Sequence, residues 1–583
     1  METMNDSAAA SPSGGELLVR CLIEQRVDLA FCVPGESYLD ALDALFEQRG
    51  RLRLIVCRHE AAAANMAEAY GKLTGKPGVC FVTRGPGATH ASIAVHTAHE
   101  DETPLVLFVG QVARGHMGRG AFQEVDYRAM FGGMAKWVAE VDDPARLPEI
   151  VARAFQVAAG GRPGPVVLAL PEDVLEARTP APVAPSRAWS RLGIEPTAAA
   201  LAQVHGELAR ARKPLLVVGG GGWSAQASEA LADFARTLRL PVVAEFRCQD
   251  YLDNRHDSYA GDLGLSTNPA LAARVRDSDL LLVLGGRLSE ALTGGYRLVD
   301  VPRPRQRMIH VHADVDELGR VYQADVLVPA TPEAFLRAAL AARQPSLAAD
   351  PSWQDWTRAA RSDYLRFLAP TREGGTVDMA QVVATLDQEL APDAIVTNGA
   401  GNYTTWLHRH YRYKHFRGQL APLNGAMGYG LPAAIAAKIH EPRRQVVCLA
   451  GDGCFLMNVQ ELETAVRYNA AIVVVVVANG SYGTIRAHQE RRFPGRVYAT
   501  DIGNPDFVAL ARSFGLSAER VTRHEDFAPA LRRALDAGVP SLIELPTEIE
   551  HLSAQSRLSA VRDRALAAAR LHSSQPQVPG TPA

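Results

Sequence analysis

The sequence lacks the features of membrane, secreted and nucleic-acid-binding proteins. No apolar run reaches the roughly 18 residues that a bilayer-spanning helix needs. Residues 1–16, METMNDSAAASPSGGE, have neither the basic start nor the apolar stretch of a secretory signal. With 61 basic and 64 acidic residues the net charge is −3, so no basic surface for nucleic acid or anionic membrane is expected. The composition therefore predicts a soluble, cytoplasmic protein whose partners are neither nucleic acids nor membranes.

Cysteine is scarce and shows no pattern. Seven cysteines are spread over 583 residues without the paired spacing of a zinc site, and an odd number does not suit a disulfide framework. We expect reduced, buried thiols.

The sequence does contain three segments in which strands alternate with helices. Apolar runs such as 29–35 and 446–453 are each followed by a helical pattern, which favours parallel sheets. A proline-rich stretch and a polar stretch separate the segments. We predict an α/β protein of three doubly wound parallel-sheet domains. The predicted division is a disordered leader at 1–14, an N-terminal domain at 15–180, a linker at 181–194, a central domain at 195–344, a second linker at 345–373, a C-terminal domain at 374–550 and a helical, then disordered tail at 551–583.

Two apolar strands in the third segment end in polar turns. VVCLA is followed by Gly451-Asp452-Gly453, and IVVVVVA by Asn479-Gly480-Ser481, with 25 residues between the turns. Carboxyl ends of neighbouring parallel strands share one edge of a sheet, so Asp452 and Asn479 are expected side by side. A carboxylate, an amide oxygen and the Ser481 carbonyl are hard ligands suited to Mg²⁺, and glycines let backbone N–H groups approach phosphates. Either motif alone is more often an ordinary turn, but the pair predicts a magnesium and phosphate site.

The stretch GDGCFLMNVQELETAVRYNAAIVVVVVANGSYG (451–483) resembles the diphosphate-and-metal motif of thiamine-diphosphate-dependent enzymes. That motif usually ends in Asn-Asn, whereas this chain has Ala478-Asn479, and Asn479 is the position that matches the metal ligand. The resemblance implies thiamine diphosphate and Mg²⁺ as cofactors. The implied metal ligands are Asp452, Asn479 and Ser481.

The first segment carries the second half of the resemblance. RHEAAAANMAEAYGKLTGKPG (58–78) is similar to the family's strand-end glutamate segment, which implies that Glu60 is catalytic and hydrogen-bonds the pyrimidine ring of the cofactor in a pyrimidine-binding domain. The alternative interpretation of Glu60 is a helix N-terminal carboxylate stabilised by the helix dipole. In the family this glutamate reaches the cofactor of a partner subunit. The resemblance therefore implies a homodimer or homotetramer with active sites at the subunit interface.

Further motifs, in the family's order from about residue 15 to 548, resemble the large catalytic subunit of acetolactate synthase. By this match Phe122, Gln123 and Lys136 line the substrate channel. In NGAMGYGLPAA (424–434), Gly425 is expected to meet the 4′-amine of the cofactor and Met427 to hold its two rings apart, although an isolated Met is more often core filler. The other implied cofactor-binding positions are Pro34, Gly35, Gly87, Asn402, Tyr403, Gly451, Gly453, Cys454, Gly480, Tyr482 and Gly483.

The central segment contains a weaker signal. VVGGGGWSA (217–225) fits a dinucleotide-binding fingerprint, with Glu245 about twenty residues further on. The same segment contacts FAD in acetolactate synthases, whereas GDLGLST (261–267) departs from their flavin segment. FAD, an adenine nucleotide and an empty domain all stay open. The residues implied for FAD are Gly220, Gly221, Gly222 and Arg287.

Two departures from acetolactate synthase concern the substrate. His488 stands where the branched-chain enzymes usually have a Trp, and Ala291 where they have an Arg that binds the carboxylate of the second keto acid. Arg486, Arg491 and Arg492 are nearby replacements for that Arg, although solvated surface arginines are the simpler interpretation.

The resemblance implies a thiamine-diphosphate- and Mg²⁺-dependent decarboxylating carboligase that acts on a 2-keto acid such as pyruvate. It would form acetolactate, or transfer the acetyl unit to another carbonyl acceptor. The alternatives are a 2-keto acid decarboxylase, a sulfoacetaldehyde acetyltransferase, a 2-hydroxyacyl-CoA lyase or, in a different class, a non-catalytic nucleotide-binding paralogue. The acceptor, a role in branched-chain amino acid biosynthesis and a regulatory small subunit stay open.

Overall fold

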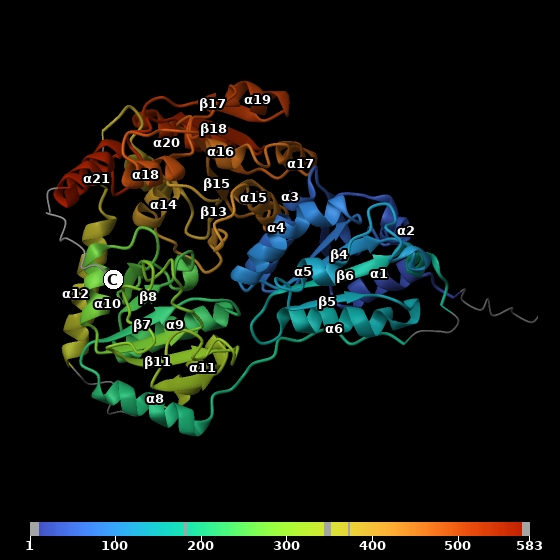
Figure 1. The fold of residues 1–583 in the computed structure, drawn as a ribbon, viewed down its shortest axis with the longest axis horizontal. Coiled ribbons are helices and arrows are strands. Elements are labelled where there is room, and N and C mark those ends of the chain that lie inside the picture. The colour runs from blue at the N-terminus through green and yellow to red at the C-terminus, as the bar shows by residue number, and fades with distance from the viewer. Residues whose placement is uncertain (1–10, 180–183, 343–350, 371–373, 574–583) are drawn as a thin grey trace, which may run out of the picture.

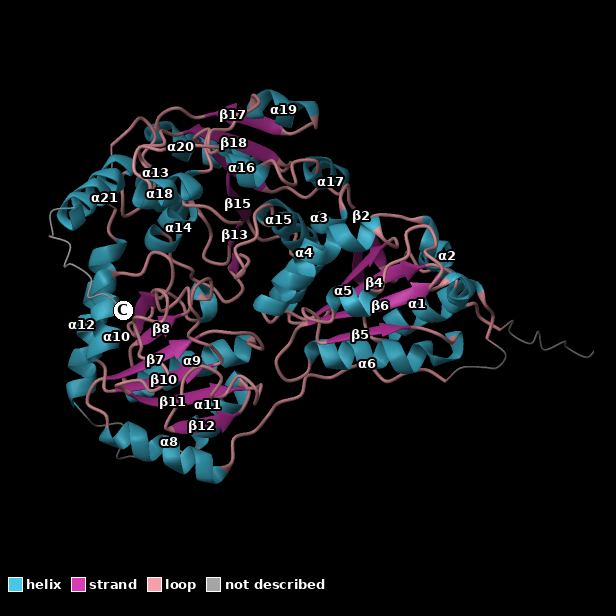
Figure 2. Cartoon of the chain, in the orientation of Figure 1, coloured by secondary structure: helices cyan, strands magenta, loops and turns pink. Residues whose placement is uncertain are grey.

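The computed structural model describes residues 11–179, 184–342, 351–370 and 374–573 and folds them into three α/β domains (Figure 1). Each domain holds a six-stranded sheet in which every strand pairs in parallel with its neighbours. Helices are interleaved between the strands throughout (Figure 2). The predicted fold class is confirmed.

The N-terminal domain has the strand order β2-β1-β3-β4-β6-β5. Its helices bury apolar residues on both faces of the sheet, in two separate clusters. The strands are β1 (Leu29–Cys32), β2 (Arg53–Val56), β3 (Gly78–Val82), β4 (Leu105–Gln111), β5 (Trp137–Glu140) and β6 (Pro165–Pro171). The helices are α1 (Gly14–Glu24), α2 (Leu39–Glu47), α3 (Glu60–Thr74), α4 (Pro86–Glu100), α5 (Tyr127–Phe131), α6 (Leu147–Ala159) and α7 (Glu172–Glu176).

The central domain has a different strand order, β9-β8-β7-β10-β11-β12, which is the order of dinucleotide-binding sheets. The order reverses between β7 and β10. The strands are β7 (Pro214–Val218), β8 (Val242–Ala244), β9 (Tyr259–Asp262), β10 (Leu280–Leu284), β11 (Arg307–His312) and β12 (Val326–Pro329). The helices are α8 (Ala198–Arg210), α9 (Ala225–Leu238), α10 (Pro269–Asp277), α11 (Pro332–Ala341) and α12 (Pro351–Leu368).

The C-terminal domain repeats the strand order of the N-terminal domain, as β14-β13-β15-β16-β18-β17. The strands are β13 (Ile395–Asn398), β14 (Gln419–Leu420), β15 (Val446–Gly451), β16 (Val473–Ala478), β17 (Ser517–Arg520) and β18 (Ser541–Pro546). The helices are α13 (Met379–Glu389), α14 (Thr404–His410), α15 (Gly430–His440), α16 (Asp452–Phe455), α17 (Glu461–Arg467), α18 (Gly483–Arg492), α19 (Phe507–Ser513), α20 (Phe527–Asp536) and α21 (Leu558–Ser573).

Most of the segment predicted as the second linker is helix α12, which packs on the central domain. The indole N–H groups of Trp353 and Trp356 donate to the backbone carbonyls of Ala211 and Pro214, each at 2.9 Å. The two tryptophans are three residues apart and so share one face of the helix. The surrounding polar residues hid this amphipathic pattern. Residues 343–350 and 371–373 lie outside the described residues, as do residues 1–10 of the leader predicted at 1–14 and residues 574–583 of the tail predicted at 551–583.

The N- and C-terminal domains of one chain share a hydrophobic core. Helix α3 packs against α15 (Figure 1), and small apolar residues of both helices, such as Ala67 and Ala434, belong to one buried cluster. The backbone N–H of Val56 donates to the Tyr468 hydroxyl at 2.8 Å across the same contact. These two domains therefore pack as one body.

All seven cysteines are unpaired and buried. Within the described ranges, no helix combines the length and apolar character that a membrane span requires.

Candidate active site

Asp452 and Asn479 follow two neighbouring strands of the C-terminal sheet. β15 pairs with β16 in parallel, with Gly451 opposite Val477. The Oδ2 atom of Asp452 accepts hydrogen bonds from the backbone N–H groups of Asn479, at 2.9 Å, and Gly480, at 2.7 Å. The amide Oδ1 of Asn479 accepts from the N–H of Ser481 at 3.0 Å. The structure thus brings a carboxylate, an amide oxygen and the Ser481 backbone together.

A further residue at this point was missed in the sequence. The side-chain amide of Asn504 donates to Oδ2 of Asp452 at 2.8 Å. Its loop returns to the end of β16, where the N–H of Ile502 donates to the carbonyl of Gly480 at 2.9 Å. Only a Gly-Asn-Pro sequence marks Asn504, and such turns are too common to single out a site.

A cavity of about 250 Å³ lies beside these strand ends. Among the described residues, its lining comes from 400–552 alone. Of the predicted cofactor and metal residues it contains Asn402, Tyr403, Gly425, Met427, Gly451, Asp452, Gly453, Cys454, Asn479, Ser481, Tyr482 and Gly483. Lining residues that the sequence did not single out are Trp406, Thr484, Ile485, Thr547, His551 and Leu552.

Bare backbone forms part of the cavity wall. A Cβ atom on Gly451 would lie 2.9 Å from the ring of Tyr403, and one on Gly453 would lie 2.8 Å from the ring of Tyr482. Gly425 has φ +71°, and a Cβ there would meet no atom within 4 Å, so its backbone faces open space. Open backbone next to three hard oxygen donors fits a phosphate group bound through a divalent cation.

Hydrogen bonds fix the side chains of Asn402, Tyr403 and Cys454 in the cavity wall. The Oδ1 of Asn402 accepts from the hydroxyl of Thr484 at 3.0 Å, which links the β13 side of the cavity to α18. The Tyr403 hydroxyl lies 3.5 Å from the sulfur of Cys454, which also accepts from the N–H of Gly428 at 3.2 Å. Burial raises the pKa of Tyr403, so its hydroxyl stays protonated and donates.

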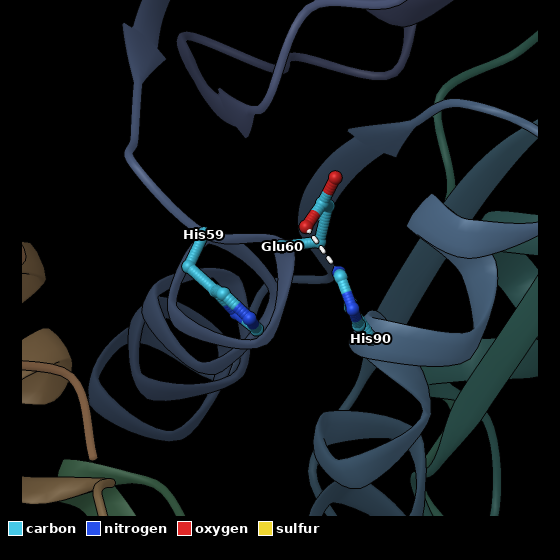
Figure 3. A group of neighbouring side chains, drawn as sticks. All are labelled: His59, Glu60 and His90. Carbon is cyan, nitrogen blue, oxygen red and sulfur yellow. Dashed lines mark hydrogen bonds and ion pairs between the residues drawn. The ribbon is translucent and has the colours of Figure 1, made fainter.

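Glu60 is the first residue of α3 and does not line this cavity. Its Oε2 lies 2.8 Å from Nδ1 of His90, a residue of α4, and the rings of His59 and His90 stack at a centroid distance of 4.6 Å (Figure 3). Burial and the neighbouring His90 lower the pKa of His59. One ring nitrogen from each histidine and one Glu60 oxygen lie within 4.8 Å of one another. The sequence did not reveal His90 as a partner of Glu60, because only the fold brings their helices together.

Pro34 and Gly35 lie in the loop after β1, and Gly87 lies in the first turn of α4, after β3, on the same edge of the N-terminal sheet as Glu60. They pack through Thr83, since a Cβ on Gly35 would lie 2.3 Å from Cβ of Thr83 and one on Gly87 would lie 2.9 Å from its Cγ2.

Phe122 and Gln123 meet this edge, whereas Lys136 does not. Gln123 has φ +65°, and its carbonyl oxygen would lie 2.7 Å from a Cβ on Gly85. Phe122 is 76% exposed in the single chain. Lys136 precedes β5, at the opposite edge of the sheet.

The contacts of Lys136 are those of a structural lysine. Its Nζ donates to the backbone carbonyls of Gly160 and Arg162, at 2.8 and 2.7 Å, beyond the end of α6. Burial lowers the pKa of Lys136 to about 8.

A second cavity, of about 440 Å³, adjoins the first and shares Asn402 and Gly425 with it. Ala291, His488 and Arg491 line this second cavity. The guanidinium of Arg491 lies 3.0 Å from Nδ1 of His488.

The other two candidate arginines make different contacts. Arg486 pairs with Glu490 at 3.2 Å, and Arg492 lies over the ring of Phe493 at 5.3 Å. Arg491 is therefore the one of the three that faces the second cavity.

The glycine turn at 219–222 follows β7, and Arg287 follows β10. These are the two strands between which the central sheet reverses its order. Arg287 pairs with the carboxylate of Glu100, from the N-terminal domain, at 3.2 Å.

The chain matches three family descriptions in the order of its domains. These are the thiamine pyrophosphate enzyme N-terminal TPP binding domain over residues 12–130, the central domain over 201–339 and the C-terminal TPP binding domain over 399–545. Glu60 falls in the first match, and Asp452 and Asn479 fall in the third. The chain therefore belongs to the thiamine pyrophosphate enzyme family.

Within this family the chain is an enzyme similar to acetolactate synthase large subunits along nearly its whole length. It is 36% identical over 553 residues to the acetolactate synthase large subunit of Parasynechococcus marenigrum, covering 93% of this chain and 88% of that protein. The Corynebacterium glutamicum large subunit is 33% identical over 532 residues, or 90% and 84% of the two chains. The Escherichia coli isozyme 2 large subunit is 32% identical over 536 residues, or 91% and 95%. The resemblance stated from the motifs is confirmed.

Proposed function

We propose that this enzyme is a Mg²⁺- and thiamine-diphosphate-dependent decarboxylating carboligase of 2-keto acids. It converts two molecules of pyruvate to acetolactate and CO₂, or transfers the acetyl unit of pyruvate to another carbonyl acceptor. The observation that carries the proposal is the convergence of Asp452, Asn479 and Ser481 on a cavity that Asn402 and Met427 also line. The similarity to acetolactate synthase large subunits supports the reaction type.

The ends of β15 and β16 would hold the metal and the diphosphate. Asp452 and Asn479 offer side-chain oxygens and Ser481 its backbone carbonyl, a set of hard donors that suits Mg²⁺. The Oδ1 of Asp452 takes one hydrogen bond, from the N–H of Gly453 at 2.8 Å, and so keeps a lone pair for a cation. When bound, thiamine diphosphate supplies the electron sink that makes the loss of CO₂ from a 2-keto acid feasible.

Glu60 would act in the cavity of a second copy of the chain. In the single chain Glu60 pairs with His90, and the cavity takes its described lining from residues 400–552. Phe122, on the same edge as Glu60, is largely exposed. A homodimer that places this edge over the partner's cavity would cover Phe122 and bring Glu60 to the pyrimidine ring, where its carboxylate holds the shared proton.

The second cavity would hold the acceptor. Arg491 supplies a cation there, at a site where Ala291 supplies none. Arginine binds a carboxylate through two parallel N–H groups, which fixes both charge and orientation. We therefore assign the carboxylate of the acceptor keto acid to Arg491.

The substitution Glu60→Gln tests the mechanism, with the exposed Glu149→Gln as a matched control. We expect kcat with pyruvate to fall by about 10²- to 10⁴-fold, because the amide cannot take up the proton. The affinity for thiamine diphosphate, measured by calorimetry with Mg²⁺, should stay within a few-fold. Unchanged turnover in Glu60→Gln would show that the mechanism is wrong.

A product screen separates the carboligase from the alternatives. The enzyme is given pyruvate alone, pyruvate with aldehydes, and pyruvate with 2-ketobutyrate, and products are identified by mass spectrometry. We expect acetolactate or another 2-hydroxy ketone. Free acetaldehyde as the sole product would instead indicate a simple decarboxylase.

A further inference from the structure

The glycine turn of the central domain has the position of a dinucleotide-binding loop. In sheets of this strand order the cofactor lies in the crevice where the order reverses, here between β7 and β10. Its pyrophosphate rests on the N–H groups of the glycine turn after the first strand. Gly220 and Gly222 have φ +66° and +76°, which suits a tight turn of this kind.

A carboxylate from the N-terminal domain occupies this turn. The N–H of Gly221 donates to Oε2 of Glu102 at 2.7 Å. A Cβ on Gly221 would lie 2.4 Å from the carbonyl oxygen and 2.5 Å from the Cβ of Glu102, and one on Gly220 would lie 1.8 Å from the carbonyl oxygen of Gly285. Positions 220 and 221 therefore have no room for a methyl group, whereas a Cβ on Gly222 would meet only Pro163, at 3.8 Å. The N–H of Gly221, which a phosphate would need, is already bound to a carboxylate.

Glu102 is held there as a buried anion. Its side chain is 3% exposed, and its Oε1 lies 3.0 Å from Nε of Arg162, 3.6 Å from Nε of Arg287 and 3.7 Å from Nε2 of His312. Burial alone would raise the pKa of Glu102, but His312, Arg162 and Arg287 outweigh it and hold the pKa at about 2. Turning the carboxylate outward would leave the N–H of Gly221 without this acceptor. It would also remove one of the counter-charges of Arg162 and Arg287, which keep Glu317 and Glu100 as partners.

The backbone conformation of Glu102 also indicates that its position is fixed by its surroundings. Glu102 has φ +53°, a left-handed conformation that is uncommon for this residue type and persists only when its surroundings fix it. The preceding Asp101 accepts from the N–H of Leu423, in the C-terminal domain, at 2.6 Å. The segment 100–102 thus contacts the central domain through Glu100 and Glu102 and the C-terminal domain through Asp101.

A second carboxylate lies on the other side of the crevice, where it lines a cavity of about 280 Å³ together with Arg287. Glu245, at the end of β8, accepts hydrogen bonds from the N–H groups of Arg287 and Leu288 at 3.0 and 2.9 Å. A Cβ on Gly219 would lie 2.1 Å from its Oε2, and one on Gly286 would lie 2.2 Å from its Oε1. The acid that would bind a ribose in a dinucleotide site is therefore turned inward. The protein's own carboxylates take the N–H groups that a pyrophosphate would need, so this turn does not fit the diphosphate of FAD.

We propose that Glu102 is the permanent internal anion of the glycine turn, and that the central domain binds neither FAD nor an adenine nucleotide. The turn that would bind a pyrophosphate instead docks the N-terminal domain. This inference goes beyond the proposed function, because the carboligase chemistry needs no flavin, and each can fail without the other.

The first test uses the wild-type enzyme loaded with Mg²⁺ and thiamine diphosphate. Released FAD is quantified after denaturation by its absorbance and fluorescence, and FAD and ADP are then titrated by calorimetry. We expect less than about one FAD per ten chains and no saturable binding below about 1 mM. Stoichiometric FAD, or micromolar binding of FAD or ADP, would overturn the proposal.

The second test removes the internal anion. In Glu102→Ala, the N–H of Gly221 loses its acceptor, and Arg162 and Arg287 each lose one of their carboxylate partners. Inorganic diphosphate and ADP should therefore bind at least about tenfold more tightly than to wild type. Glu149→Ala, on the surface of α6, is the matched control. Should Glu102→Ala fail to fold, Glu102→Gln keeps the shape and removes the charge, and the same gain is expected. A folded Glu102 variant with no gain in anion binding would show that Glu102 does not act as the internal anion.

Discussion

Two glycine turns of this chain follow buried parallel strands, and they differ in the groups that meet their N–H groups. The turn at 451–453 begins at the last residue of β15 and lies beside a cavity of about 250 Å³. The turn at 219–222 follows β7 and is in contact with Glu102 and Glu245. Each strand flanks the point at which the order of its sheet reverses.

The difference lies in side chains that come from elsewhere in the chain. Around Gly451 and Gly453 the nearest groups are the rings of Tyr403 and Tyr482, which leave the polar side of the turn open. In the central domain, carboxylates from two other segments occupy the polar side. A glycine turn at a strand end therefore provides N–H groups for an anion, and the rest of the fold decides whether that anion is a ligand or the protein's own carboxylate.

The largest effect is expected for Asn479→Ala, at the end of β16 beside the turn at 451–453. Losing the amide oxygen beside Asp452 removes a metal ligand, so the Kd for thiamine diphosphate in the presence of Mg²⁺ should rise by about 100-fold or more. Calorimetric titration measures it, with Gln354→Ala, an exposed amide on α12, as the control. Tight binding by Asn479→Ala would overturn the assignment of the metal site.

A glycine-to-alanine substitution in each of the two turns should separate an effect on the free energy of unfolding from an effect on cofactor affinity. Gly220→Ala places a methyl group against the carbonyl of Gly285 at a positive φ, so the free energy of unfolding should fall by about 3 kcal/mol or more. Gly451→Ala meets only the ring of Tyr403, which lines the cofactor cavity, so the methyl group should disturb the cavity wall and weaken cofactor binding more than it destabilises the fold. Urea denaturation and calorimetry of both variants check this. Equal effects on cofactor affinity would contradict the contrast between the two turns.

Glu102, which binds the turn at 219–222, should make the free energy of unfolding depend on pH. The folded pKa of Glu102, about 2, lies below its ordinary value of 4.5, so its ionisation stabilises the protein above pH 4.5 and this contribution is lost as pH falls toward 2. The contribution is about 3 kcal/mol at pH 7. The difference in unfolding free energy between wild type and Glu102→Gln should therefore shrink between pH 6 and pH 3. A difference that does not change with pH would show that Glu102 is not held as an anion.

The smallest effect is expected for Asn504→Ala. Asn504 contacts Asp452 and not the cavity, so its loss should leave the metal ligands in place and only relax the carboxylate. The Kd for thiamine diphosphate should rise by about tenfold, with kcat at saturating cofactor nearly unchanged. An unchanged Kd would mean that the backbone N–H groups alone orient Asp452.

The sequence was sufficient for the features that depend on local pattern. The apolar runs before Asp452 and Asn479 predicted two parallel strands, and the shared edge of a parallel sheet predicted their nearness. The long-range contacts could not be predicted from the sequence. Asn504, His90 and Glu102 reach their partners across 52, 30 and 119 residues. The neighbouring residues in the sequence do not indicate these contacts, because only the completed fold brings the segments together.

The glycine fingerprint of the central domain shows a related limit of prediction from sequence. Its spacing correctly indicates a tight turn between a strand and a helix. What meets the N–H of Gly221 depends on Glu102, which lies in a different domain and far away in the sequence. A motif is therefore evidence for a backbone shape, and only the three-dimensional surroundings tell what that shape binds.

The shared core between α3 and α15 bears on how such an enzyme can evolve. Ala67 and Ala434 belong to one buried cluster, so a recombination event that replaced only the N-terminal domain would leave the face of α15 without its partner. The two domains must then be inherited together, although one copy of the chain would use its N-terminal domain to complete the site of the other.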